Sequence, residues 1–271
     1  MGDVLTMKSL KNCSLLISTY NWPEALNLCL KSVMRQSVLP AEVLIADDGS
    51  TEETREVIGR YMELYRLPIK HIWHEDTGFR LAEIRNKAIA QAETDYIVQI
   101  DGDVILDRYF IQDHLRVAEK GCFVRGTRGH VGESYIKELF ESGNIALHAF
   151  SKGVQHRFNT LRWPFLSWVM TKREAKGGDV KGCNLAYWKS DFIAVNGYNN
   201  ALQGWGHEDE EFTIRLVNTG VRRKKIKLCC VQFHIFHPLA SRAHEEEHQQ
   251  VIDALYRSGQ STCIDGYAQV L

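Results

Sequence analysis

The sequence predicts an α/β fold in which a mixed, mostly parallel sheet is flanked by helices. Short apolar runs alternate with amphipathic stretches through the first half of the chain, as they do in successive strand–helix–strand units. Polar clusters directly follow several of these runs, and open α/β sheets bind ligands at such strand ends. The 271 residues, 44% of them hydrophobic, are enough for one unit with a full core.

The elements of the first half are separated by clear breaks in the pattern. We expect strands at residues 13–18, 43–46, 69–73 and 96–100, which are short and mostly apolar segments. Residues 23–35 should form a helix because apolar side chains recur there at helical spacing, and residues 80–92 should form another. A further helix should begin at Ser50 or Thr51, either of which can cap it, and run to about residue 65. Its first turn holds Glu52 and Glu53, where the helix dipole favours anions.

The pattern changes beyond about residue 129. We expect a helical stretch at residues 134–148, an aromatic and basic segment at residues 157–173, and a charged terminal helix at residues 241–259. We expect the chain to pack in the core again at residues 181–187, 192–195 and 228–236. The chain therefore divides into residues 1–128, residues 129–240, and a helix and tail at residues 241–271, which together form a single unit.

Composition excludes several classes of protein. Lys and Arg total 33 against 34 for Asp and Glu, so no global positive field favours nucleic acid, and we expect no nucleic-acid partner. No apolar run approaches the roughly 18 residues that a membrane span needs, and no basic segment precedes an apolar run at the N-terminus. Most of the seven cysteines lie in apolar runs, as reduced core thiols do, which predicts a cytoplasmic protein.

Two carboxylates stand one residue apart directly after the apolar run at residues 96–100. Asp101 and Asp103 can present hard oxygen ligands to one divalent cation because Gly102 lets the backbone turn tightly. A turn without any ligand is the alternative, but a second acidic strand end at Asp47 and Asp48 favours the cation. Since carboxylates repel a diphosphate, a cation must lie between such a ligand and the protein.

Four strand-end segments resemble those of family 2 glycosyltransferases with the Rossmann-like GT-A fold. In chain order they are Ser18-Thr19-Tyr20-Asn21, Asp47-Asp48-Gly49-Ser50-Thr51, Arg85-Asn86-Lys87-Ala88 and Asp101-Gly102-Asp103. The resemblance implies a UDP-sugar donor, with Thr19, Tyr20 and Asp48 around the uridine and Arg85 near the nucleotide. Ordinary turn chemistry is the alternative for the first three, and a solvated helix position is the alternative for Arg85.

The same resemblance assigns roles to the acidic segment. Asp103 is implied as the main metal ligand. Asp101 is implied to face the ribose or a metal-bound water, as a supporting ligand, and Gly102 lies between them against the donor.

A second resemblance lies in the other half of the chain. Residues 204–209, Gly-Trp-Gly-His-Glu-Asp, resemble a motif of β-1,4-galactosyltransferases and chondroitin-type polymerases, and residues 181–184 and 196–198 extend the match. It implies that Asp209 is the general base that deprotonates the acceptor hydroxyl, although spacing alone does not separate Asp209 from Glu208. Trp205 offers a flat face for a sugar ring. A helix start with acids in its first turn is the alternative, and both can hold together.

Two imidazoles three residues apart end the last apolar run. His234 or His237 could complete the metal shell, and the resemblance favours His237, whereas a packed histidine is the alternative reading of either. A mixed site of carboxylate and imidazole favours Mn²⁺ over Mg²⁺.

The sequence therefore predicts an inverting, metal-dependent glycosyltransferase of polysaccharide biosynthesis. It would move a hexose or N-acetylhexosamine from a UDP-sugar to a hydroxyl of a glycan or lipid-linked glycan. A catalytically silent carbohydrate-binding protein of the same fold is one alternative. A sugar nucleotidyltransferase is another, but residues 18–23 lack the Gly-rich basic loop that it needs.

The aromatic and basic segment at residues 157–173 has two interpretations. Trp163, Phe165, Trp168 and Met170 could meet a lipid-linked or extended glycan acceptor, with peripheral contact to the inner face of the membrane. Packing in the core or between halves is the alternative.

Overall fold

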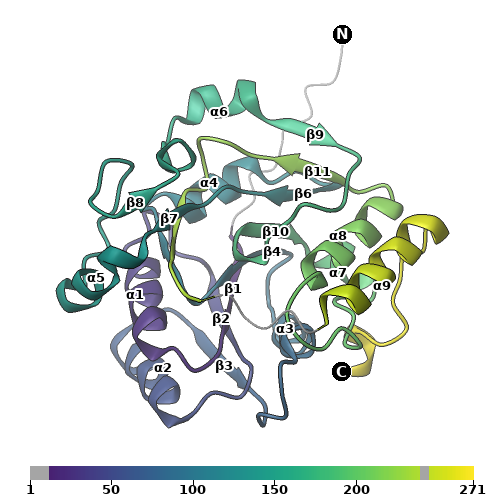
Figure 1. The fold of residues 1–271 in the computed structure, drawn as a ribbon, viewed down its shortest axis with the longest axis horizontal. Coiled ribbons are helices and arrows are strands. Elements are labelled where there is room, and N and C mark those ends of the chain that lie inside the picture. The colour runs from purple at the N-terminus through teal and green to yellow at the C-terminus, as the bar shows by residue number, and fades with distance from the viewer. Residues whose placement is uncertain (1–11, 239–243) are drawn as a thin grey trace.

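The computed structural model describes residues 12–238 and 244–271 (Figure 1). Within them the main sheet has eight strands in the order β3-β2-β1-β4-β10-β6-β11-β9. Strands β3, β2, β1 and β4 are parallel and β11 is parallel to β6, whereas β10 and β9 run antiparallel to their neighbours. The predicted mixed, mostly parallel sheet is confirmed. Its strands are β1 Ser14–Thr19, β2 Glu42–Asp47, β3 Ile69–Trp73, β4 Tyr96–Asp101, β6 Cys122–Arg125, β9 Lys172–Glu174, β10 Leu185–Trp188 and β11 Arg222–Lys225.

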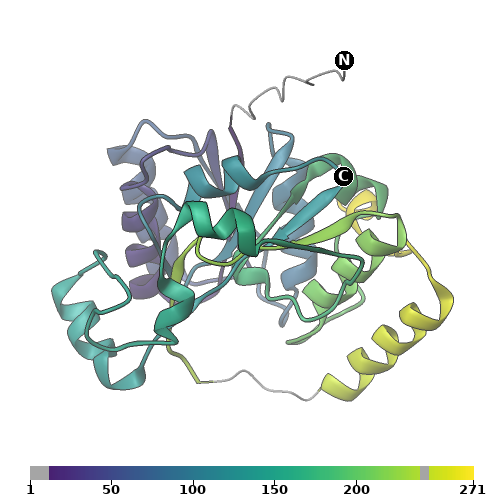
Figure 2. The same cartoon turned by 90° about the horizontal axis from the view of Figure 1, so that it is seen from above.

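Helices cover both faces of this sheet because its strands β1, β2 and β4 carry buried apolar residues on both sides. Leu15 and Ile17 pack with apolar residues of α1, α2 and α4, whereas Leu16 packs with those of α3, α7 and α8. Figure 2 shows the strands between the purple helices of the N-terminal part and the green helices of the second half. The helices are α1 Pro23–Val33, α2 Glu52–Leu64, α3 Leu81–Ala90, α4 Phe110–Val117, α5 Ile136–Ser142, α6 Pro164–Met170, α7 Lys189–Ala194, α8 Glu208–Asn218 and α9 Glu245–Ser258.

A smaller sheet joins segments that are far apart in the chain. Its order is β5-β12-β7-β8, with β5 Val104–Leu106, β7 Gly129–Val131, β8 Val154–Gln155 and β12 Gln232–Ile235. Strand β12 is antiparallel to β5, so that His234 lies opposite Val104, and the Ile235 N–H donates to the Asp103 carbonyl at 2.9 Å. This pairing carries the end of β12 to the acidic segment that follows β4.

Several predicted boundaries need correction. The helix expected at residues 134–148 ends at Ser142, because Gly143 has a φ of 57° and turns the chain out of the helix. Thr51 does occupy the N-cap position of α2, but its side chain makes no capping bond, and its hydroxyl donates to Glu53 instead. Of the segment expected at residues 192–195 to return to the core, Phe192 in helix α7 and Val195 are buried, whereas Ile193 and Ala194 are exposed. The terminal helix begins at Glu245, and residues 241–243 of the prediction lie outside the described residues.

The first strands end side by side. Thr19 at the end of β1 is in register with Asp47 of β2, and Ser18 is in register with Asp101 of β4. The parallel direction of these strands therefore gathers their polar ends at one edge of the sheet.

Candidate active site

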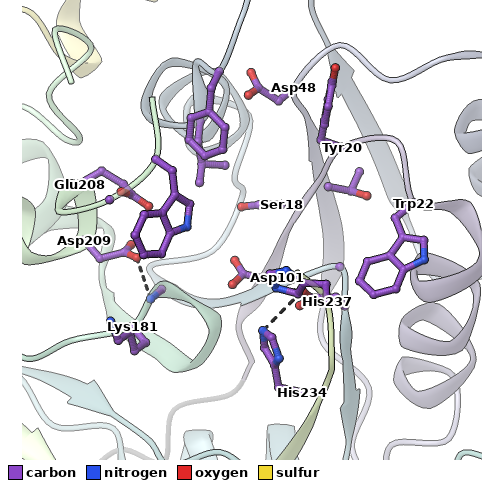
Figure 3. Close-up of a pocket in the computed structure, with 18 of the residues that line it drawn as sticks. Ser18, Tyr20, Trp22, Asp48, Asp101, Lys181, Glu208, Asp209, His234 and His237 are labelled. Carbon is purple, nitrogen blue, oxygen red and sulfur yellow. Dashed lines mark hydrogen bonds and ion pairs between the residues drawn. The ribbon is translucent and has the colours of Figure 1, made fainter. Parts of the chain in front are cut away.

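A cavity of about 650 Å³ opens at this edge (Figure 3). Every site residue predicted from the sequence lines it: Thr19, Tyr20, Asp48, Arg85, Asp101, Gly102, Asp103, Trp205, Glu208, Asp209, His234 and His237. Segments separated by up to about two hundred residues in the chain thus face one space. Their contacts divide the cavity into three parts.

The first part is formed by the ends of β1 and β2. The Asp48 carboxylate accepts hydrogen bonds from His74 Nε2 at 2.7 Å and from the Arg80 N–H at 2.9 Å, which fix its orientation. The Tyr20 hydroxyl donates to Asp76 at 2.9 Å, and half of the Tyr20 side chain stays exposed. His74 was missed from the sequence, although it directly follows the apolar run of β3.

Arg85 occupies the floor of the cavity. Its Nε donates to Ser18 Oγ at 2.9 Å, Nη1 to Asp209 Oδ1 at 3.0 Å and Nη2 to Asp101 Oδ1 at 3.2 Å. The side chain is only 1% exposed, so the alternative of a solvated helix position is wrong. Burial opposes its charge, but the charges of Asp209, Tyr198 and the other acids outweigh burial and raise the pKa of Arg85.

The second part is the start of helix α8. Asp209 Oδ1 accepts from Arg85, from the Tyr198 hydroxyl at 3.1 Å and from Gln99 Nε2 at 3.3 Å, whereas Oδ2 accepts the Gly182 N–H at 2.7 Å. A carboxylate that accepts from four donors is held in one orientation in its acceptor-only form. A Cβ on residue 182 would collide with that carboxylate, so a glycine is needed there.

Glu208 differs from its neighbour. Its Oε2 atom is buried without a hydrogen-bond partner among the described residues. Burial, followed by the charge of Asp209, raises the pKa of Glu208 to about 7. Two adjacent carboxyl groups therefore occupy different environments, one surrounded by donors and the other poorly solvated.

The third part can hold a metal ion. One carboxylate oxygen of Asp103 and one ring nitrogen each of His234 and His237 lie within 4.8 Å of one another. Asp103 Oδ2 is 3.2 Å from His237 Nε2 and 3.4 Å from His234 Nε2. The hydrogen bond to Asp103 raises the pKa of His237 to about 8, whereas burial lowers the pKa of His234.

The donor set fits a divalent ion. Asp103 Oδ1 is buried and has no hydrogen-bond partner among the described residues, as expected for an oxygen that serves a cation. His237 Nδ1 lies 2.7 Å from the Pro238 carbonyl, a contact that would hold the ring proton on Nδ1 and leave Nε2 free to coordinate when a metal ion is bound. One carboxylate with two imidazoles suits Mn²⁺ better than Mg²⁺.

Asp101 and Gly102 line the cavity next to Asp103. The Asp101 carboxylate lies against Arg85 and is outside the group formed by Asp103 and the two histidines. Gly102 does not have a positive φ. Gly102 and Asp103 form the turn between β4 and β5, and a Cβ on Gly102 would lie 3.1 Å from both the Ser18 carbonyl and Thr19 Oγ1, so close packing against the end of β1 also favours the glycine.

Sequence reasoning missed two cations and two polar core residues of the site. Arg128 and Lys181 line the cavity and supply positive charge near its acids. Gln99 and Tyr198 are buried and connect to Asp209. Gln99 had a signal, because a polar residue stood inside the apolar run of β4.

Two protein-family models match this chain. A sequence model described as glycosyl transferase family 2 matches residues 14–167, and one described as the N-terminal domain of galactosyltransferase matches residues 171–238. This chain belongs to glycosyl transferase family 2. Both resemblances inferred from the motifs are thereby confirmed.

The relatives are longer than this family 2 chain. It is 28% identical over 222 residues to a validoxylamine A glucosyltransferase of Streptomyces hygroscopicus subsp. limoneus, covering 77% of this chain and 48% of the relative. It is 24% identical over 223 residues to a chondroitin synthase of Escherichia coli, covering 76% of this chain and 32% of the relative. The chain thus spans about half or less of these proteins.

Solved structures show the same fold. The structure of S. aureus TarS 1–349 in complex with UDP superposes with a TM-score of 0.62 at 16% identity, covering 96% of this chain and 68% of that one. GalNAc-T7 with UDP, GalNAc and Mn²⁺ gives a TM-score of 0.67 at 15% identity, covering 93% of this chain and 49% of that one. The GT-A fold that the resemblance implied is confirmed.

Proposed function

We propose that this protein is an inverting, metal-dependent glycosyltransferase that moves a hexose or N-acetylhexosamine from a UDP-sugar to a hydroxyl of a glycan or lipid-linked glycan. The observation that carries the proposal is that one cavity contains both the group formed by Asp103, His234 and His237 and the firmly held carboxylate of Asp209. The group of Asp103 and the two histidines can hold a metal ion that binds the diphosphate of the donor. The Asp209 carboxylate can accept a proton from an acceptor hydroxyl.

The donor would bind along the edge formed by β1, β2 and β4. Asp48 uses two of its lone pairs on His74 and Arg80, and the others can accept the N–H of uracil. Thr19 and Tyr20 line the same end. UDP is present in the TarS and GalNAc-T7 structures of the same fold, which supports UDP as the nucleotide.

Asp103, His234 and His237 would hold the metal, with Asp101 beside them next to Arg85. When bound, Mn²⁺ supplies positive charge that offsets the charge on the departing diphosphate. Arg128 and Lys181 also line the cavity and can add to that compensation. We propose that both bind donor oxygens.

The acceptor would enter by a groove of about 870 Å³ that shares Asp103, His237 and Trp205 with the donor cavity. Its lining is rich in aromatic side chains, which can stack on sugar rings: Tyr20, Trp22, Phe79, Trp205 and Phe236. Trp205 faces both spaces, so it is placed where donor sugar and acceptor meet. This arrangement favours a glycan over a small alcohol as the acceptor.

Asp209 would act as the general base. Its Oδ2 accepts only the Gly182 N–H within the described residues and retains a lone pair for the acceptor proton. As the proton passes to Oδ2, the acceptor oxygen forms a bond to the anomeric carbon. The bond from that carbon to the phosphate oxygen breaks, and UDP leaves with that electron pair. Attack from the face opposite the phosphate inverts the anomeric carbon.

The test is release of UDP from purified protein with a set of UDP-sugars, Mn²⁺ or Mg²⁺, and oligosaccharide acceptors. Metal-dependent UDP release that rises with acceptor supports the proposal. Tight UDP-sugar binding without turnover would instead identify a silent binding protein. Release of pyrophosphate from a sugar phosphate and UTP would identify a nucleotidyltransferase.

We further propose a cytoplasmic location. All seven cysteines lie within the described residues, and they are free and buried, as in proteins of a reducing compartment.

A further inference from the structure

Helix α6 turns an apolar face to the solvent. Phe165, Trp168 and Val169, spaced as neighbours on one side of the helix, are 75%, 76% and 61% exposed, and the preceding Trp163 is 61% exposed. Ser167, on the opposite side, is buried. A surface helix normally buries its apolar side, so α6 is reversed. In Figure 1 it lies at the top, at the far end of the molecule from β3.

Contacts with the core fix this orientation. The Trp163 N–H donates to the Leu228 carbonyl at 2.8 Å. Arg162 forms two hydrogen bonds, at 2.8 and 2.7 Å, with the fully buried Asp113 of α4. A buried carboxylate bound by a bidentate arginine is costly to release. The aromatic face of α6 is therefore held outward by the fold.

Basic residues outnumber acids in the segment that contains α6. Residues 157–176 contain five basic residues, Arg157, Arg162, Lys172, Arg173 and Lys176, against one acid, Glu174, although the whole chain has a net charge of -1. Lys172 and Lys176 are exposed, and within the part of the chain that the structure describes neither forms an ion pair. Next to β9, strand β11 consists of four consecutive basic residues, of which Arg222 is exposed, Arg223 is buried and paired with Glu174, and Lys224 is paired with Glu119.

A cavity of about 550 Å³ lies at the edge of α6. Phe165 and Trp168 line it on one side, and Arg116, Arg173 and Lys224 also line it. Arg173 and Lys224 share Glu119 as a counter-ion, so the cations exceed the acids at this place. Aromatic surface beside several cations fits an anionic group attached to an apolar body.

We propose that α6 and its basic flank, residues 157–176 with β11, form a docking surface for the face of an anionic lipid bilayer. Trp and Phe side chains partition into the interface between water and hydrocarbon, and lysines and arginines are attracted to anionic headgroups. A second copy of the chain is a poorer occupant, because a symmetric dimer through this face would place its cations against themselves. No helix in the described residues is long and apolar enough to cross a membrane, so contact would be at the surface. The surface is separate from the proposed active site.

The experiment is sedimentation of the full chain with vesicles of phosphatidylcholine alone or with 30% phosphatidylglycerol. We expect binding to the anionic vesicles that weakens as salt rises. Phe165→Ser combined with Trp168→Ser should lower the partition coefficient at least tenfold. Lys172→Ala combined with Lys176→Ala should lower it roughly 30-fold on anionic vesicles alone, from about 1 kcal/mol per cation. UDP release with a soluble acceptor should be unchanged in both.

Leu64→Ser is the matched control, because Leu64 is also 75% exposed but lies on α2, in the part of the chain next to β3. It should bind vesicles like the unaltered chain. The proposal is overturned if the unaltered chain does not bind anionic vesicles, or if the α6 variant binds as well as the control. It is also overturned if the chain is a dimer in solution that the α6 variant dissociates, since the face would then be a protein interface.

Discussion

Replacing Asp209 by Asn tests the assignment of the base most directly. The carboxylate accepts hydrogen bonds from Arg85, Tyr198 and Gln99 on one oxygen and from the Gly182 N–H on the other. The amide nitrogen of Asn is a donor, so in either orientation it would face at least one donor. The variant therefore loses the proposed proton acceptor and at least one of the hydrogen bonds that hold this side chain.

The two losses have different magnitudes. Loss of general-base catalysis lowers turnover by about 10²- to 10⁴-fold. The donor-to-donor contact and the removal of one charge partner from buried Arg85 cost about 2–3 kcal/mol of folding stability, since Asp101 and Glu208 remain near the guanidinium. For a chain of this size the melting temperature should fall by roughly 4–12 °C.

The assay is UDP release at a temperature well below the melting point of the variant, together with UDP and Mn²⁺ affinity by calorimetry. We expect kcat to fall at least 100-fold while UDP affinity stays within about threefold, because Asp209 lies away from the uridine end of the cavity. Glu208→Gln is the matched control and should lose less. The reasoning is refuted if Asp209→Asn keeps kcat within threefold while Glu208→Gln loses it, because Glu208 would then be the base.

The remaining predictions concern the metal, the pH dependence and Arg85. His234→Ala and His237→Ala should each raise the Mn²⁺ concentration for half-maximal UDP release by at least about tenfold, and an unchanged metal titration for either would exclude that residue as a ligand. Because burial and the charge of Asp209 raise the pKa of Glu208 to about 7 from 4.5, the folded chain keeps a proton that the unfolded chain loses. The contribution of Glu208 to stability is thus present below pH 4.5 and is lost as pH rises toward 7. The Tm of Glu208→Gln should therefore fall less between pH 5 and pH 8 than the Tm of the unaltered chain. Parallel plots of Tm against pH for the two proteins would contradict this. Arg85→Lys should lower kcat about 100-fold, because one ammonium cannot reach Ser18, Asp101 and Asp209 together; full activity would show that a point charge suffices.

The first half of the fold was predictable because β1, β2 and β4 are buried on both faces and their sequences are mostly apolar. Strand β11 gave no such signal, since all four of its residues are basic and its place in the sheet comes from pairing with β6 and β9. The helix after residue 134 was predicted too long because sequence periodicity continued past Gly143, whose left-handed conformation ends it. Local pattern therefore failed where a single residue or a distant partner decides the structure.

In the site, too, some features were predictable from local sequence and others depended on distant partners. Motif order was enough to name residues that line one cavity, because strand ends in a parallel sheet share an edge. Spacing could not choose between His234 and His237, because both approach Asp103 only through the pairing of β12 with β5. The contact of His74 with Asp48 was also invisible, since it joins the ends of two different strands.

The charge distribution in the cavity explains why Asp101 and Asp103, so close in sequence, take different positions. Arg85 forms ion pairs with both Asp101 and Asp209, the proposed base, and so supplies positive charge to two carboxylates in a buried place. Asp103 is outside the reach of that cation and faces two histidines instead. The carboxylate that we propose as the metal ligand is thus the one that faces imidazoles, and the carboxylate that we propose as the base is the one that faces Arg85.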